Sequence, residues 1–180
     1  TPELGGILSG AISRWEGLSG RGMSGGIRFH VQEPSDISAY FQTRFPGLVV
    51  KKHSKLQETS LEILQAVAKD RQAIGLVGLD WIDSAGVPAK VLDVAAPEED
   101  ADTLFRPPVE TIGKFYPPHP AHIYRSYYPL KRAVYFYSRS LRGDLSSGFA
   151  AFVGNKEGQR LFLERGLVPA TQPIRLKPSE

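Results

Sequence analysis

Apolar residues recur at intervals of three and four positions in several stretches of this chain, and this interval is typical of amphipathic helices. The clearest such helix is predicted to begin with Ser60 as its cap, because Leu61, Leu64, Val67 and Ala68 then share one face. Further helices are predicted over residues 2–12, 35–45, 147–152 and 156–165. Proline, serine or asparagine stands at or just before the start of each of them, which favours these boundaries.

Strands are predicted between these helices. Alternate side chains are apolar over residues 27–32, and glycines permit close backbone approach in a buried strand over residues 73–78. Aromatic and branched residues predict another strand over residues 133–137, whereas irregular loops with a short strand or helix are predicted over 95–129. Shorter strands are predicted at residues 48–50, 90–94 and 173–176. Strands that alternate with helices predict an α/β domain with a mostly parallel sheet flanked by helices.

Composition excludes several classes of function. The 180 residues contain no cysteine, so disulfides, thiolate metal sites and cysteine nucleophiles are excluded. The net charge is +3, but the basic residues are scattered rather than gathered in a stripe, so we do not expect nucleic-acid binding. The sequence contains no nucleophile elbow, phosphate loop or paired-histidine zinc motif. We therefore expect a protein that is not an enzyme and that needs no cofactor or metal.

Two groups of residues have alternative interpretations. His119 and His122 could bind a metal, but no third ligand accompanies them, and histidines in a solvated loop are the simpler interpretation. Tyrosines between residues 124 and 137 could line a binding cleft. Strand packing and hinge anchoring are the simpler explanation for them.

Four motifs along the chain resemble those of a known family. They are LSGAISRWEGL at residues 8–18, DRQAIGLVG at 70–78, YPLKRAVY at 128–135, and GLVPAT at 166–171, which follows the pair Gly158-Gln159. In this order they resemble the periplasmic phosphate-binding protein of bacterial ABC phosphate importers, in the type 2 periplasmic binding protein superfamily. The resemblance runs through most of the chain.

This resemblance implies an extracytoplasmic protein, periplasmic or lipid-anchored, whose two α/β lobes clamp an anion and deliver it to an ABC permease. Residues 1–125 would form the second lobe, and residues 126–180 would return to the first. Family members carry a long segment before the first motif, so the first lobe would be incomplete here. The chain would then be a shortened piece or a natural short relative. Half a lobe exposes apolar surface and a sheet edge, so association of copies through it stays open.

In the family, the second lobe holds phosphate at a strand–loop–helix element, and the matching element here is residues 31–38. The ligand-binding residues that the resemblance implies are Gln32, Ser35, Asp36, Ile37 and Ser38. The N–H groups of a first helical turn and the positive end of the helix dipole attract an anion. We expect the amides of residues 36–38 to point outward.

The charges of this element depart from the family pattern. Gln32 and Glu33 stand where the family has an arginine, and Asp36 stands where a small or hydroxyl residue is usual. A carboxylate about 4 Å from an anion costs about 4 kcal/mol per unit-charge pair at an effective dielectric of about 20. Two interpretations stay open: Ser35 and Asp36 belong to an oxyanion site, or they are only the cap and first-turn acid of a helix. The second interpretation fits a sensor or protein-interaction module that has lost the anion site.

Overall fold

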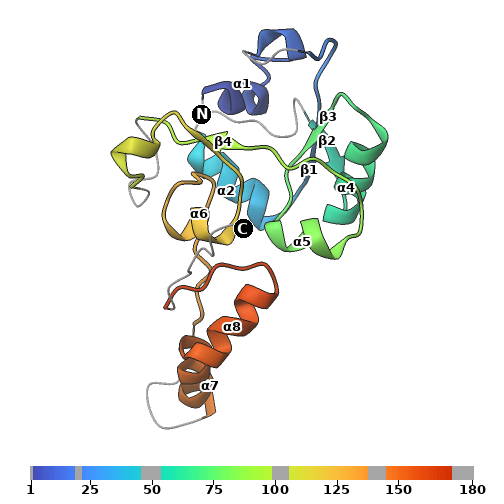
Figure 1. The fold of residues 1–180 in the computed structure, drawn as a ribbon. Helices are drawn as coiled ribbons and strands as arrows, with labels where there is room; N and C mark the ends of the chain where they lie inside the picture. The colour runs from blue at the N-terminus through green and yellow to red at the C-terminus, as the bar shows by residue number, and fades with distance from the viewer. Residues whose placement is uncertain (1, 19–21, 46–53, 99–105, 138–144, 172–180) are drawn as a thin grey trace, which may run out of the picture. The chain divides into compact units, whose positions relative to one another are not determined.

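The computed structural model describes residues 2–18, 22–45, 54–98, 106–137 and 145–171. The chain forms two compact units, which are drawn in Figure 1. The first unit consists of residues 1–92 and 97–104, and the second of residues 93–96 and 105–180. The lobe boundary that we expect near residue 125 stays a prediction.

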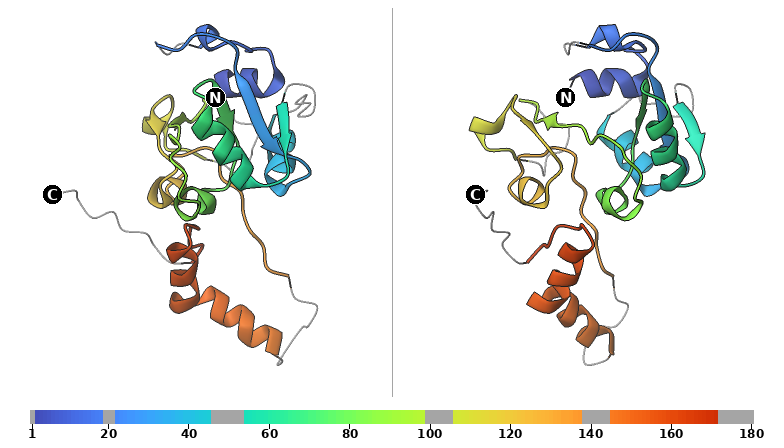
Figure 2. Two further views of the ribbon diagram at one scale, coloured as in Figure 1. Left: turned by 90° about the vertical axis from the view of Figure 1, so that its right-hand side faces the viewer. Right: turned by 45° about the vertical axis from the view of Figure 1, so that its right-hand side comes forward.

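The first unit is a parallel sheet flanked by helices, as the sequence predicts. Its elements are α1 (Pro2–Ser9), η1 (Trp15–Gly17), β1 (Arg28–Gln32), α2 (Asp36–Arg44), β2 (Ser54–Gln57), α4 (Ser60–Lys69), β3 (Ala73–Gly75) and α5 (Leu79–Ser84). β1 is the central strand in the order β2-β1-β3, and both neighbours run parallel to it. The connection from β1 to β2 and the connection from β2 to β3 run in opposite directions across the sheet. Because both crossovers are right-handed, their helices must lie on opposite faces of the sheet. Figures 1 and 2 show α2 and α4 in these positions.

α4 packs closely on one face of the sheet. Gly75 of β3 permits this approach, because a Cβ there would lie 2.4 Å from Cγ2 of Ile63. The predicted buried face of α4 is wrong in part: Leu61 is 37% exposed and Ile63 is fully buried instead. Ile63 rather than Leu61 faces the sheet because it lies over Gly75, and Ser60 is buried on the same side. The cap is Thr59 and not the predicted Ser60, since the Thr59 side chain accepts the N–H group of Glu62.

The opposite face of β1 forms the second part of this core. Phe29 and Val31 are buried there, as their alternation predicts, and α2 contributes the buried Phe41. The Phe41 ring stacks on Phe45, with centroids 5.9 Å apart. α1 lies against the same ring, because a Cβ at Gly5 would be 3.4 Å from Cδ1 of Phe45. The core therefore lies on both faces of β1.

The second unit contains short elements. They are β4 (Val94–Ala95), η2 (Val109–Thr111), β5 (Phe115–Tyr116), α6 (Pro120–Tyr124), α7 (Leu145–Gly154) and α8 (Lys156–Glu164). β4 and β5 form an antiparallel pair. The irregular chain predicted over residues 95–129 is confirmed where the structure describes it. Within the described ranges, no helix is both long enough and apolar enough to cross a bilayer.

The C-terminal motif has a local structural role. Asn155 caps α8 by accepting the N–H group of Gly158, as predicted. The buried Gln159 donates from Nε2 to the carbonyl of Val153 (2.7 Å) and accepts the N–H group of Ala170 at Oε1 (2.6 Å). The predicted left-handed glycine after α8 is confirmed by a φ of 75° at Gly166.

Several predicted elements differ from those observed. The strand predicted over residues 73–78 ends at Gly75, and only the last residue of 90–94 is in a strand. Residues 133–137 pair with no strand of the described chain, and β2 forms where none was predicted. The N-terminal helix ends three residues early, because Gly10 adopts a φ of 77°. The strands predicted at 48–50 and 173–176 lie outside the described residues.

Candidate functional site

The carboxyl edge of the sheet gathers three helix N-termini. β1, β2 and β3 run parallel, and each is followed after two or three residues by a helix, namely α2, α4 or α5. Because the carboxyl ends of parallel strands share an edge, these helix N-termini share it as well. The chain passes from β2 across β1 to β3, so the ends of β1 and β3 form a topological switch point. Ligands of open α/β sheets bind at such points.

The first turn of α2 and the start of α5 are neighbours at this edge. The N–H group of Leu76 donates to the carbonyl of His30 in β1 (3.2 Å). A Cβ at Gly78 would lie 3.9 Å from Cδ1 of Ile37. A solute above the first turn of α2 would therefore lie beside residues 76–78. The sequence predicts a buried strand over residues 73–78 and does not indicate that residues 76–78 lie beside the first turn of α2.

Ser35 and Ser38 close the N-terminus of α2 on itself. Ser35 Oγ accepts the N–H group of Ser38 (3.0 Å) and donates to the carbonyl of Gln32 (2.8 Å). Ser38 Oγ accepts the N–H group of Ser35 (3.1 Å) and donates to the carbonyl of Ser35 (2.8 Å). Both hydroxyl protons are thus donated to backbone carbonyls within the turn. The amide of Ser38 does not point outward as expected, because the capping box uses it, and Asp36 and Ile37 supply the remaining first-turn amides.

The side chains around this turn carry negative charge. Asp36 is exposed, and Oε2 of Glu33 is buried without a hydrogen-bond partner among the described residues. The Gln32 amide is turned toward α4, where its Oε1 accepts the Ser60 hydroxyl (3.3 Å). The structure thus places Gln32, Ser35, Asp36, Ile37 and Ser38 at one strand–helix junction. It turns Gln32 away from the other four.

Each of the three helix N-termini at this edge has one acid in its first turn, and they differ in what caps them. At α4, the Glu62 carboxylate accepts the N–H groups of Glu58 (2.9 Å) and Thr59 (3.3 Å), so the helix supplies its own anion. At α5, the Asp80 carboxylate folds back over the start of the helix, since a Cβ at Gly78 would meet its Oδ1. Only α2, among these three, closes its capping box with neutral hydroxyl groups. Of the three, α2 is therefore the one whose cap itself carries no charge, although Asp36 stands in its first turn.

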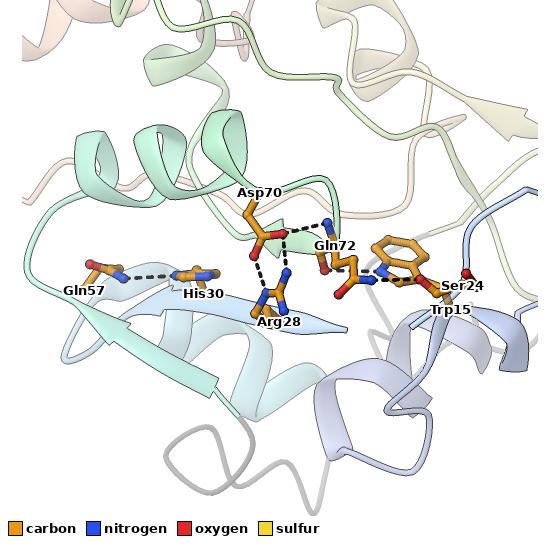
Figure 3. A network of polar contacts seen from close by, with 7 residues as sticks. All are labelled: Trp15, Ser24, Arg28, His30, Gln57, Asp70 and Gln72. Atoms are coloured by element: carbon orange, nitrogen blue, oxygen red, sulfur yellow. Dashed lines mark hydrogen bonds and ion pairs between the residues drawn. The ribbon is translucent and has the colours of Figure 1, made fainter. Parts of the chain in front are cut away.

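A polar network closes the opposite, amino edge of the sheet (Figure 3). Arg28, at the start of β1, forms a two-pronged ion pair with Asp70, and Asp70 also accepts the N–H group of Gln72 (3.0 Å). The Arg28 guanidinium holds the pKa of Asp70 down, from 3.8 to about 2. The Trp15 indole donates to the Gln72 carbonyl (3.2 Å), and the Gln72 amide donates to the carbonyl of Ser24 (2.9 Å). These contacts join loop, strand and helix, so they are structural.

His30 lies in β1 between the two edges of the sheet, and no sequence motif singles it out. It is 5% exposed, and its Nδ1 lies 3.0 Å from Nε2 of Gln57 in β2. Burial lowers the pKa of His30, and the nearby Lys55 lowers it further. The alternation in β1 could have indicated this position. Because Phe29 and Val31 lie on one face of the strand, His30 must lie on the other.

The histidines of the second unit form a ring cluster. His119 Nδ1 accepts the N–H group of Ala121 (3.2 Å) as the cap of α6, and His122 Nδ1 lies 3.1 Å from the carbonyl of Pro117. The His122 ring packs against Tyr116 and Tyr127. In the part of the chain that the structure describes, no group of three or more metal-binding side chains occurs.

Comparison with known proteins gives one informative match. No family model matches the sequence, and no curated protein matches it. The fold is similar to that of a crystal structure from Clostridium perfringens, assigned as a phosphate ABC transporter substrate-binding protein and solved with bound phosphate. The TM-score is 0.62 at 19% sequence identity, and the match covers 93% of this chain. This chain spans 61% of the length of that protein. The chain thus shares the mixed α/β fold of that protein, with a parallel sheet flanked by helices in its first unit.

Proposed function

We propose that this chain is part of a solute-binding protein that holds phosphate or a similar small oxyanion. The observation that carries the proposal is the position of α2, whose neutral-capped N-terminus stands at the switch point of a parallel sheet. The fold likeness to a phosphate-bound substrate-binding protein supports it. Such a protein works without covalent chemistry and needs no cofactor.

In this proposal the anion lies above the first turn of α2. The amides of Asp36 and Ile37 face it, Ser35 and Ser38 hold the turn in shape, and Gln32 fixes the end of β1. The positive end of the helix contributes about 0.3–1 kcal/mol at an exposed position. Because the Asp36 carboxylate opposes this attraction, we expect weak binding by this chain alone.

The proposed protein would work by lobe closure. Residues 1–125 form one lobe and residues 126–180 belong to the other, and the closed form around the anion is recognised by a membrane permease. The protein would act outside the cytoplasm, where it captures the solute before transport. Association of copies is not needed for this function.

A second candidate is a sensor or interaction module that keeps the lobe without the anion site. The observation that favours it is the capping box, in which both hydroxyl protons of Ser35 and Ser38 already have acceptors. The carboxylates of Glu33 and Asp36 act in the same direction. In this case α2 has a cap and no ligand.

Titration followed by amide NMR distinguishes the two candidates. We expect phosphate or sulfate at millimolar concentration to shift the Ile37 amide resonance saturably, with calorimetric heat if the affinity allows. Asp36→Asn should tighten binding about tenfold or more, because it removes a repelling charge. Asp93→Asn, which changes the net charge equally at a residue of the second unit, is the control. If added anion shifts the Ile37 amide resonance neither in the parent chain nor in Asp36→Asn, the anion site is excluded and the second candidate is left.

A further inference from the structure

A row of polar side chains on β1 faces α4. The row consists of Arg28, His30 and Gln32, which alternate along the strand with its apolar side chains. The two outer members are bonded to the ends of the helix. Gln32 accepts the Ser60 hydroxyl at the start of α4, and Arg28 forms an ion pair with Asp70 directly after it. His30 therefore lies under the span of α4 between its two fixed ends.

His30 is buried in the contact between α4 and the sheet. In the register of β1 and β3 it is paired with Gly75, so both residues point to the same side of the sheet. Ile63 of α4 covers that side, since a Cβ at Gly75 would meet it. His30 is 5% exposed, and its Nδ1 lies 3.0 Å from Nε2 of Gln57 in β2 (Figure 3). All of these residues belong to the first unit.

The charged groups around His30 disfavour a further positive charge. The charged side chains of this face and of α4 are Lys55 on β2, Arg28 on β1, Glu62 and Lys69 on α4, and Asp70 directly after the helix. Both acids already have partners, because Asp70 pairs with Arg28 and Glu62 accepts N–H groups of its own cap. Lys55 is the register partner of His30 in β2 and adds a positive charge on the same side. A proton on His30 would thus find no free acid among these groups.

The hydrogen bond of His30 also belongs to the neutral ring. Nε2 of Gln57 is an amide donor, so Nδ1 of His30 accepts from it only while Nδ1 carries no proton. A proton at Nδ1 would require the Gln57 amide to turn over. Burial lowers the pKa of His30, and Lys55 lowers it further, in agreement with these contacts. The packed contact of α4 with the sheet therefore holds the neutral form of the ring.

We propose that His30 is a proton-sensitive switch of α4, in which protonation of the ring opens the contact between the helix and the sheet. A form in which α4 has lifted from the sheet exposes the ring to water, where the charged imidazole is hydrated. Opening also releases the end of β1, because Ser60 holds Gln32 there. If the proposed function holds, anion binding at the neighbouring α2 weakens in acid. The switch itself does not depend on that function.

Hydrogen exchange followed by NMR at pH 7.5 and 5.5, without added anion, tests the switch in the 180-residue chain. Dividing each rate by the intrinsic rate at that pH gives the equilibrium of local opening. We expect α4 to open about fivefold to tenfold more at the lower pH, because a hydrated histidine takes up a proton below about pH 6.5. His30→Gln should abolish this increase. His122→Gln, which removes a histidine of the second unit, is the matched control and should retain it.

Lys55→Gln gives an independent check, because it removes the positive charge beside His30 and leaves the ring in place. The pH-dependent increase in α4 opening should then be smaller than in the parent chain. Three results would overturn the proposal. They are an α4 that opens equally at both pH values, an increase in His30→Gln as large as in the parent chain, and amides of α4 that exchange no faster than those of β1, since α4 would then open only when the whole unit unfolds.

Discussion

The contact between α4 and β3 gives the sharpest test of the first unit. A Cβ at Gly75 would lie 2.4 Å from Cγ2 of Ile63 and 3.2 Å from Cγ2 of Val67. Carbon atoms in contact are normally 3.5–4.0 Å apart. Ile63 is fully buried, so it cannot turn into solvent to make room. We expect Gly75→Ala to destabilise the chain by about 1–3 kcal/mol through overpacking.

Urea denaturation followed by tryptophan fluorescence measures this effect in the first unit. Both tryptophans, Trp15 and Trp81, belong to that unit. We expect the midpoint for Gly75→Ala to fall by about 1 M. Gly5→Ala in α1 is the matched control, since its Cβ would make an ordinary 3.4 Å contact with Phe45. It should stabilise by up to about 1 kcal/mol, as alanine replaces glycine in a helix. Equal midpoints for Gly75→Ala and the parent chain would refute the close packing of α4 on β3.

Three further predictions concern charges and caps. The pKa of Asp70 is lowered from 3.8 to about 2 in the folded chain. The ionised carboxylate therefore contributes its full stability above about pH 4, and this contribution is lost as the pH falls toward 2. Asp70→Asn should remove this acid dependence of stability in a circular-dichroism titration. Burial lowers the pKa of His30, so the unfolded chain binds the proton first. Stability should decline as the pH falls below about 6.5, and the urea midpoint of His30→Gln should change less between pH 7.5 and 5.5. Ser35→Ala should cost about 1 kcal/mol in thermal melts because the cap of α2 is lost, and Ser35→Gly should cost less.

Local patterns were sufficient for the centre of the fold. Apolar alternation predicted β1, and the Pro-Ser pair predicted the start of α2, because both signals act within a few residues. β2 was missed because its sequence, SKLQ, carries one apolar side chain, which is 47% exposed. Its strand conformation follows from pairing with β1. The strand predicted over residues 133–137 was wrong for the opposite reason. Its residues have high β-propensity, but no neighbouring strand among the described residues pairs with them.

The candidate site was predictable in position but only partly in detail. A serine before a helix that follows a strand indicates an N-terminal cap, and the structure has one at Ser35. That both hydroxyl protons are used within the turn depends on the rotamer of Ser38, which sequence does not specify. The ion pair of Arg28 with Asp70 joins residues 42 positions apart and requires the register of β1 against β3. Contacts of this kind arise from tertiary packing alone.

α4 is attached to the central strand at both of its ends. At its start, the Ser60 hydroxyl donates to the side chain of Gln32, the last residue of β1. Directly after the helix, Asp70 forms an ion pair with Arg28, the first residue of β1. A ten-residue helix is about 15 Å long, so it acts as a rigid brace along the whole strand. With two anchors it can neither slide along the sheet nor roll upon it without detaching at one end. The end of β1 at the carboxyl edge is thus held in place by α4, and under the proposed function little ordering entropy would be lost there when a solute binds.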